Sequence, residues 1–303
     1  MSRIAALMVL SLSLVSCSDP ETVPPLDAGP RMPDASTDGG PAPDASPSDA
    51  GAPSDGAVAP DAGAAAFTLP PVNAGLDYQL GGAYAPPAGV QIVSRDRTEA
   101  PALGLYNICY VNGFQSQPGD DSFWLVDHPT LVLRDSSGAP VIDPDWGEML
   151  LDVRTDASRA GLATIVDGWI AGCAADGFDA VEIDNLDSYS RSGGLMTESQ
   201  AVSFMRLLAD AAHAAGLAIA QKNAAELVPR RAELGTDFVV AEECNRYSEC
   251  DVYTGGYGDH VLVIEYRRAD FTTGCGAFPN LSIVLRDLDL LTPANAGYVY
   301  DGC

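Results

Sequence analysis

Short apolar runs recur from residue 90 onward and alternate with segments of helical periodicity. Residues 162–173 carry apolar side chains at helical spacing and stop before Gly177, and Thr197 with Gln200 forms a capping-box sequence that opens a second helix, ending at Gly216. This strand and helix order favours parallel strand pairing. The runs that we expect to be strands are 90–93, 105–111, 149–153, 180–183, 217–220, 238–241, 261–264 and 281–285, with 78–80 as a ninth candidate.

Residues 67–303 have the length of one α/β domain, close to the roughly 250 residues of a (β/α)8 barrel. We therefore expect a TIM barrel preceded by a disordered N-terminal tether. A doubly wound open sheet is the alternative fold. No glycine-rich dinucleotide fingerprint follows the first strands, which disfavours that alternative and gives no reason to expect a cofactor.

The N-terminus has the composition of an export signal. A basic start is followed by an apolar run over 4–15 and by Leu14-Val15-Ser16-Cys17, which resembles a bacterial lipobox. The run is shorter than the roughly 20 residues that span a bilayer, and an ordinary secretory signal or a buried helix is the alternative. We expect residues 1–17 to be a lipoprotein signal peptide and Cys17 to anchor the protein to the membrane at the bacterial cell envelope or surface.

Residues 18–66 consist almost entirely of Pro, Ala, Asp, Gly and Ser, which predicts a disordered linker. Of the formal net charge of −26, this linker carries −8 and Arg3 +1, which leaves −19 for residues 67–303. An acidic domain is unsuited to nucleic acid, because phosphates are neutralised by Lys and Arg. A polycationic ligand is its natural counterpart, although acidity also serves solubility.

Six cysteines remain after Cys17, in a chain that we expect to be exported to an oxidising space. Cys244 with Cys250 and Cys275 with Cys303 are plausible disulfides, whereas Cys109 and Cys173 lie in apolar segments and are disulfide partners or buried thiols. The sequence has three histidines and no CxxC spacing. We therefore expect no metal site.

The run 177–189 is predicted to be a buried strand that ends in carboxylates. Strand periodicity places Glu182 and Asp184 on one face. Unpaired charges are costly in a core, so these acids indicate a site; an ion pair or a helix cap at Asp184 or Asn185 is the alternative. In a parallel barrel the strand ends meet at one rim, where barrel enzymes place their active sites.

Other polar groups follow the remaining strands. By strand parity Lys222 shares a face with Ala220, Glu242 with Val240 and Glu265 with Val263, but the sequence leaves open which face lines the barrel. Two carboxylates from different strands are what glycoside cleavage requires, one to protonate the leaving oxygen and one to act as nucleophile or base. The candidate substrate-binding residues are Asp152, Asn185, Asp187, Tyr189, Lys222, Asn223, Glu265 and Tyr266.

The segments 177–189, Gln221-Lys-Asn223, Ala241-Glu-Glu-Cys244 with Glu249-Cys-Asp251, and Ile264-Glu-Tyr266 resemble the successive motifs of glycoside hydrolase family 114. The resemblance covers about residues 78–300. It implies a TIM-barrel endo-α-1,4-polygalactosaminidase acting on galactosamine-containing exopolysaccharide. Ala241 departs from the family, which usually has Asn before the second acid.

Carried over residue by residue, the resemblance implies that Asp184 and Glu242 are the catalytic acids. We favour Asp184 as nucleophile or base and Glu242 as acid, although the sequence permits the reverse. The expected partner is a cationic, partly deacetylated amino-sugar polysaccharide, and we expect a monomer that binds no nucleic acid. A non-catalytic glycan-binding barrel and a metal-assisted deacetylase are the rival functions. For single residues the structural alternatives are an ion pair of Lys222 with a rim acid such as Glu265, and packing roles for Tyr189 and Tyr266.

Overall fold

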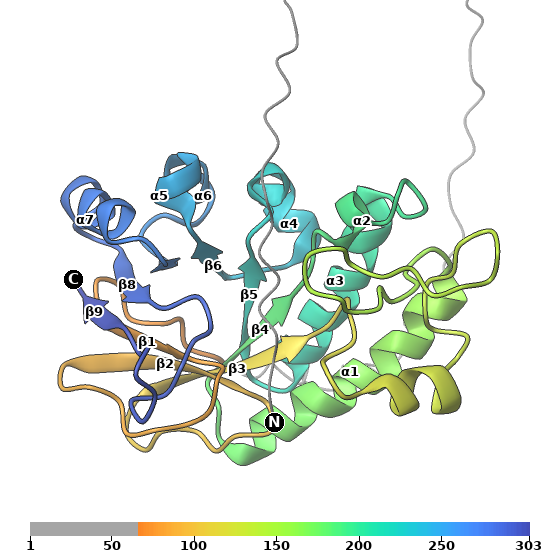
Figure 1. Cartoon of the computed structure of the whole chain (residues 1–303), viewed down its shortest axis with the longest axis horizontal. Helices are drawn as coiled ribbons and strands as arrows, with labels where there is room; N and C mark the ends of the chain where they lie inside the picture. Colours follow the sequence, from red (N-terminus) through yellow and green to blue (C-terminus); the bar gives the residue numbers. More distant parts are fainter. Residues whose placement is uncertain (1–65) are drawn as a thin grey trace, which may run out of the picture. The chain divides into compact units, whose positions relative to one another are not determined.

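The expected parallel strands form one continuous sheet that curls into an α/β barrel (Figure 1). This computed structural model describes residues 66–303, so the expected signal peptide with Cys17 and the linker up to residue 65 lie outside the described residues. Neighbouring strands from β1 to β8 pair in parallel, and β9 pairs antiparallel with β8. The strands are β1 (Gly75–Gln79), β2 (Val90–Asp96), β3 (Tyr106–Asn112), β4 (Ala180–Asp184), β5 (Ala218–Lys222), β6 (Phe238–Glu242), β7 (Val261–Glu265), β8 (Ser282–Arg286) and β9 (Tyr300–Gly302).

One expected strand is wrong. Residues 149–153 make isolated antiparallel bridges, Leu150 with Gln115 and Leu151 with Val132, inside the long connection between β3 and the first α-helix. Their apolar side chains are buried in one core cluster with residues of α1 and α3. The run is therefore as hydrophobic as a barrel strand, although it does not belong to the barrel. The candidate at 78–80 overlaps β1, which supplies the missing barrel strand.

Both expected helices are confirmed. Helix α1 begins after Thr155 and ends at Gly177, whose φ of 92° is the left-handed conformation that glycine adopts without a Cβ penalty. Helix α3 is opened by the reciprocal capping box of Thr197 and Gln200. The helices are η1 (Phe123–Asp127), α1 (Asp156–Asp176), α2 (Ser188–Arg191), α3 (Glu198–Ala214), η2 (Ala225–Arg230), α4 (Arg231–Leu234), α5 (Cys244–Tyr247), α6 (Cys250–Tyr257) and α7 (Arg268–Ala277).

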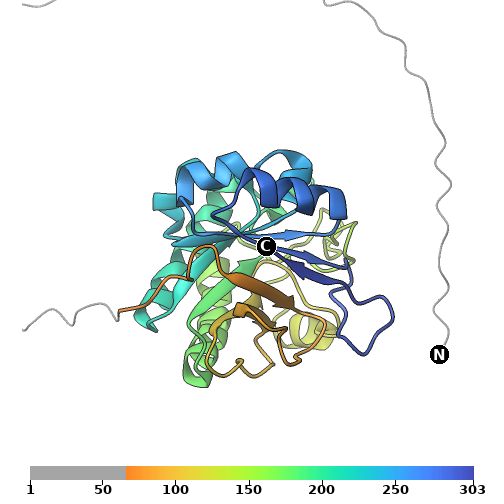
Figure 2. The same ribbon diagram turned by 90° about the vertical axis from the view of Figure 1, so that its left-hand side faces the viewer.

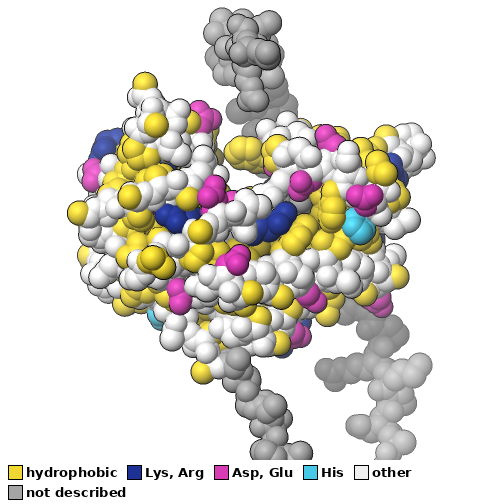
Figure 3. Space-filling model, turned by 90° about the horizontal axis from the view of Figure 1, so that it is seen from below, with side chains coloured by type: hydrophobic (Ala, Val, Ile, Leu, Met, Phe, Trp, Pro, Cys, Tyr) yellow, Lys and Arg dark blue, Asp and Glu magenta, His cyan; other side chains and the backbone are white. Residues whose placement is uncertain are grey.

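The helices cover only part of the barrel. No helix occurs between β1 and β2 or between β2 and β3, so loops alone connect these strands. Helices α1 and α3 to α7 lie outside the later strands (Figures 1 and 2). None of these helices is long and apolar enough to cross a bilayer. On the face in Figure 3, acidic, basic and hydrophobic side chains are interspersed.

Alternate residues of each strand fill the barrel interior. Ile108, Ala220, Val240 and Ile264 belong to one buried cluster inside the barrel, whereas Val263 belongs to a separate cluster under the outer helices. This assignment resolves the parity that the sequence leaves open. The inward set continues, at the carboxyl ends of the strands, into the polar residues of the site.

A buried ion pair joins β1 and β8, the two strands between which the described residues form no backbone ladder. Arg286 Nη1 donates to Asp77 Oδ1 at 3.0 Å, and both side chains are fully buried. The same guanidinium donates to the carbonyls of Tyr78, Leu291 and Val299. Arg286 therefore closes the barrel with side-chain hydrogen bonds.

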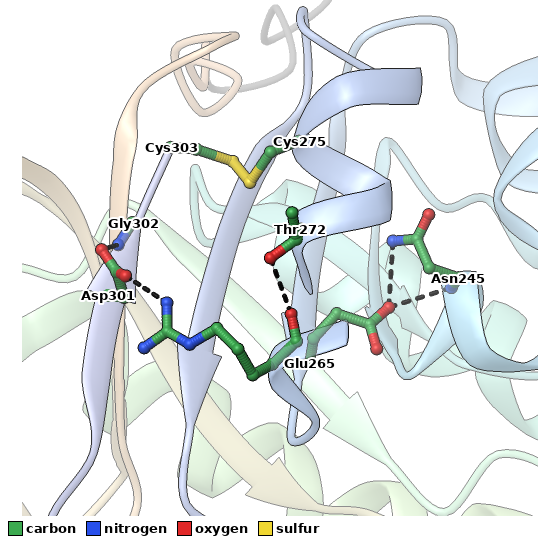
Figure 4. The surroundings of a disulfide bond; sticks show 8 residues. Asn245, Glu265, Thr272, Cys275, Asp301, Gly302 and Cys303 are labelled. Carbon is green, nitrogen blue, oxygen red and sulfur yellow. Dashed lines mark hydrogen bonds and ion pairs between the residues drawn. A yellow bond between two sulfur atoms is a disulfide. The ribbon is translucent and has the colours of Figure 1, made fainter. Parts of the chain in front are cut away.

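Three disulfides fasten the outer layer. Cys244 pairs with Cys250, and Cys275 with Cys303, both as expected. The latter ties α7 to the residue after β9 (Figure 4). Cys109 and Cys173, for which buried thiols were the alternative, also form a disulfide and join β3 to α1.

We expect Arg286→Met to destabilise the domain by about 3–5 kcal/mol, because it leaves the Asp77 carboxylate buried without its counter-charge. Urea unfolding of residues 66–303 measures this change. Arg206→Met is the matched control, since Arg206 pairs with Asp210 on the surface and such pairs contribute about 0–1 kcal/mol. Equal losses in the two variants would contradict the role of Arg286 in closing the barrel.

Candidate active site

Charged and phenolic side chains gather inside the carboxyl-terminal mouth of the barrel. Each charged side chain points into the barrel because it lies two residues after an inward-facing apolar residue of the same strand. The pairs are Ala180 and Glu182, Ala220 and Lys222, and Val240 and Glu242. The strand register brings β4, β5 and β6 side by side. Residues far apart in the sequence therefore meet at one place.

Lys222 lies at the centre of this cluster. Its Nζ is 3.3 Å from Glu182 Oε1, 3.3 Å from Asp184 Oδ1 and 3.2 Å from Glu242 Oε2, and it donates to the Tyr78 hydroxyl at 3.1 Å. The side chain is 2% exposed. Burial alone would lower the pKa of Lys222, but the surrounding carboxylates outweigh burial and raise it well above its ordinary value. Lys222 is therefore a fixed positive charge.

Asp184 is held as a carboxylate. It accepts from the Tyr110 hydroxyl at 2.7 Å and from the Asn185 backbone N–H at 2.8 Å, and its side chain is 19% exposed. Burial favours the protonated form, but the Lys222 charge and these two donors outweigh burial and lower the pKa of Asp184. The group suits the role of an ionised nucleophile.

Glu242 contacts the same ammonium and is more exposed than Asp184, at 27% of its side chain. Its carboxyl accepts from the Tyr266 hydroxyl and, at 3.2 Å, from Asn223 Nδ2. Asn223 Oδ1 in turn accepts from the Glu242 backbone N–H at 2.8 Å. Asn223, which directly follows β5, therefore holds both the backbone and the side chain of Glu242 at the end of β6.

Glu182 lies one layer deeper and is fully buried. It accepts from the Tyr78 hydroxyl at 2.5 Å and from Ser94 Oγ at 3.0 Å. Burial raises the pKa of Glu182, although Lys222 and Tyr78 oppose the shift. Glu182 is inaccessible to a substrate, and its contacts support Lys222 from below.

The chain turns sharply as it leaves each of these strands. Asn185, Asn223 and Glu243 directly follow the strands and have φ of 64°, 47° and 56°, in the left-handed region. Asn tolerates this region better than most residues, because its short polar side chain bonds locally. The chain therefore changes direction directly after Asp184, Lys222 and Glu242.

The rim encloses a cleft of about 370 Å³. No Lys or Arg is among its lining residues, so a cationic ligand meets no like charge there. The carboxylates in the lining are Asp187, Glu226, Glu242, Glu243 and Glu249. The aromatic side chains in the lining are Trp146, Tyr247, Tyr253 and Tyr266, and Asn223 and Leu288 are also present.

Several expected substrate-binding residues lie at the cleft or beside the acids. Asp187, Asn223 and Tyr266 line the cleft, and Lys222 lies beneath it. Asn185 holds Asp184 through its backbone and donates its side-chain amide to Asn112. Tyr189 is outside the lining set and donates to Glu226, which is a lining residue.

Two expected substrate-binding residues, Glu265 and Asp152, lie away from both the cleft lining and the two acids. Glu265 has the outward parity of Val263 and faces the helices, where its Oε1 accepts from the backbone and side chain of Asn245 (Figure 4). Glu265 therefore does not balance Lys222 either. Asp152 lies in the connection between β3 and α1 and makes a two-pronged pair with Arg154.

Sequence reasoning missed residues that the β3–α1 connection brings to the site. Asn112 Nδ2 donates to Glu148 Oε2 at 3.1 Å, while Asn112 Oδ1 accepts from Asn185. Burial raises the pKa of Glu148 to about 7, and the nearby charge of Asp184 adds to the shift. Trp146, in the same connection, lines the cleft. Trp146 and Glu148 end no barrel strand, so no sequence pattern marked these two residues.

The arrangement is suited to acid and nucleophile chemistry. Two partly exposed carboxylates contact one buried ammonium. Glu242 lines the cleft, whereas Asp184 lies beside Glu242 and outside the cleft lining. Two neighbouring carboxylates are the pairing that glycoside hydrolysis uses. Within residues 66–303, no group of three or more His, Cys, Asp or Glu side chains is arranged to hold a metal ion.

Comparisons with known proteins agree with this geometry. The model of glycoside-hydrolase family GH114 matches residues 56–303. A crystal structure of Ega3 from Aspergillus fumigatus in complex with galactosamine superposes with a TM-score of 0.63 and 23% identity, covering 78% of this chain and 98% of that one. The glycoside hydrolase domain of PelA from Pseudomonas aeruginosa superposes with a TM-score of 0.51 and 15% identity, covering 74% of this chain and 97% of that one.

The two structures show a shared fold, and no curated protein sequence matches this chain. The family match includes every strand of the barrel and all the carboxylates around Lys222. The chain therefore belongs to glycoside-hydrolase family GH114 and is a glycoside hydrolase.

Proposed function

We propose that this glycoside hydrolase cleaves α-1,4 linkages within a galactosamine-containing polysaccharide, with Asp184 as nucleophile and Glu242 as acid and base. The observation that carries the proposal is the Lys222 ammonium, which lies between these carboxylates at 3.3 and 3.2 Å. The galactosamine bound by Ega3 supports the choice of sugar, since the two proteins share the fold.

In the first step, Asp184 Oδ attacks the anomeric carbon and forms an ester, while Glu242 donates its proton to the departing glycosidic oxygen. Tyr110 and Lys222 keep Asp184 ionised for this attack. In the second step, Glu242 takes a proton from water, and the water oxygen displaces Asp184 from the anomeric carbon.

The spacing of the acids favours retention of the anomeric configuration. Asp184 Oδ1 and Glu242 Oε2 both contact Lys222 Nζ, so they are at most 6.5 Å apart, the sum of the two contact distances. Inverting enzymes hold their carboxyl groups about 6.5–9.5 Å apart and retaining enzymes about 5–5.5 Å. The upper limit of 6.5 Å coincides with the lower end of the inverting range, so the shared ammonium favours the shorter separation.

The charge of the cleft favours an amino sugar with free amino groups. The lining contains five carboxylates and no Lys or Arg. The surrounding chain is acidic as well, with −19 over residues 67–303. A partly deacetylated polymer is cationic and is attracted over the Debye length of roughly 8 Å at physiological salt.

The N-terminal sequence supports a place of action outside the cytoplasm. We propose that Cys17 carries the lipid anchor and that the linker connects it to the catalytic domain, which acts as a monomer at the bacterial cell envelope or surface. An exopolysaccharide would be within reach of a domain held in this way.

We expect Asp184→Asn and Glu242→Gln each to lower the release of reducing ends from partly deacetylated polygalactosamine by at least about 10²-fold, because each removes one of the two chemical groups. Asp210→Asn is the matched control, since Asp210 is an exposed acid on α3. Unchanged cleavage by a folded Asp184→Asn protein would reject the assignment.

We expect Lys222→Met to move the acidic limb of the pH–rate profile upward by about one to three pH units, since Lys222 lowers the pKa of Asp184. Activity is lost as pH falls through the pKa of Asp184 in the folded enzyme, so a raised pKa shifts this loss to higher pH. Lys222→Arg keeps the charge and should leave the limb in place. A fall in rate without any shift in Lys222→Met would contradict the electrostatic role.

We expect the first product formed from an α-linked galactosamine oligosaccharide to be the α-anomer, because two displacements at the same carbon restore its configuration. Proton NMR recorded during the first minutes of the reaction, before mutarotation, distinguishes the anomers. Initial accumulation of the β-anomer would show a single displacement by water and would contradict Asp184 as nucleophile.

A further inference from the structure

Trp146 presents an exposed indole to the catalytic cleft. Trp146 is 66% exposed and lines the same cleft as Glu242 and Tyr266. Isolated exposed apolar residues are ordinary on protein surfaces. Here Leu288, at 64%, and Tyr247, at 57%, are exposed around the same cleft, so the apolar area is concentrated beside the acids.

The turn that carries Trp146 is built on a buried carboxylate. Asp143 is fully buried, and its Oδ1 accepts from the backbone N–H groups of Asp145 at 2.9 Å and Trp146 at 3.4 Å. Its main-chain carbonyl accepts from the Gly147 N–H at 2.9 Å. The exposed indole therefore extends from a backbone that is fixed by hydrogen bonds.

The same carboxylate connects this turn to the segment that follows the proposed nucleophile. Asp143 Oδ2 accepts from Gln115 Nε2 at 2.9 Å and from Arg191 Nε at 2.5 Å. Arg191 also donates to Asp187 Oδ2 at 2.7 Å and to Asn185 Oδ1 at 3.1 Å. These hydrogen bonds couple the turn of Trp146 to the residues directly after Asp184.

We propose that Trp146 is an aromatic platform on which a pyranose ring of the polysaccharide stacks, forming a sugar subsite that adjoins the catalytic acids. The apolar C–H face of the ring covers the indole, and the carboxylates of the cleft, Asp187 among them, lie near its polar substituents. Asp143 and Arg191 are positioning residues for the platform. This inference rests on the proposed polysaccharide hydrolase function.

Intrinsic fluorescence tests the platform directly, because the chain has three tryptophans and the other two lie apart from the cleft lining. Trp124 is fully buried, and Trp169 packs against the core and under Arg97. A galactosamine oligosaccharide titrated into inactive Asp184→Asn protein should change the emission. The change should persist when Trp169→Phe is added and be lost when Trp146→Phe is added. An undiminished change in the Trp146→Phe protein overturns the proposal.

Steady-state kinetics supplies the second readout. Trp146→Ala, in otherwise wild-type enzyme, should raise KM for the polymer roughly three- to ten-fold, which corresponds to the loss of about 0.7–1.4 kcal/mol of stacking, with kcat nearly unchanged. Trp146→Phe should recover part of this loss. Leu103→Ala is the matched control, because Leu103 is 99% exposed and is not part of the cleft lining.

The outcomes separate the two proposals. Wild-type cleavage with an unchanged KM in Trp146→Ala refutes the platform and leaves the hydrolase function intact. A wild-type enzyme that neither cleaves nor binds the galactosamine polymer refutes the proposed substrate and the platform with it. Cleavage with a raised KM and a fluorescence change that requires Trp146 supports both.

Discussion

The active site depends on one buried positive charge among three negative ones. Lys222 contacts Glu182, Asp184 and Glu242, which otherwise would repel one another in a region of low dielectric. The ammonium offsets that repulsion and separates the acids by role: Glu182 lies inaccessible below, Asp184 is held ionised, and Glu242 remains at the cleft. Parallel pairing of β4, β5 and β6 is what brings these groups together. The position of the two proposed catalytic acids therefore depends on the parallel order of the barrel strands.

Most of the fold could be predicted from periodicity and capping. The two long helices follow from apolar spacing and from the capping residues at Thr155, Thr197 and Gly177, of which the last two were read from the sequence. The run 149–153 misled because burial in the core between the barrel and the outer helices selects the same apolar residues as burial in a barrel strand. Side-chain closure of the barrel by Arg286 was not predictable, since it depends on contacts between the first and last parallel strands.

The site was predictable where it coincides with strand ends. Asp184 and Glu242 meet because their strands are parallel neighbours of β5, but the face that lines the barrel is set by the closed sheet and not by any single strand. Glu265 was misplaced for that reason, since its parity points it at the outer helices. Trp146 and Glu148 were missed because they lie in the β3–α1 connection and in no helix or barrel strand. Their positions depend on tertiary contacts made by Asn112 and Asp143.

The central claim is that Lys222 keeps Asp184 ionised as the nucleophile. The most direct measurement is mass spectrometry of peptides from enzyme that has reacted with an activated fluorosugar related to galactosamine, which slows breakdown of the glycosyl-enzyme ester. The account predicts a glycosyl adduct on the peptide that contains Asp184, formed more slowly in Lys222→Met protein at acidic pH. An adduct on Glu242, or turnover of the reagent with no adduct in any variant, would contradict it.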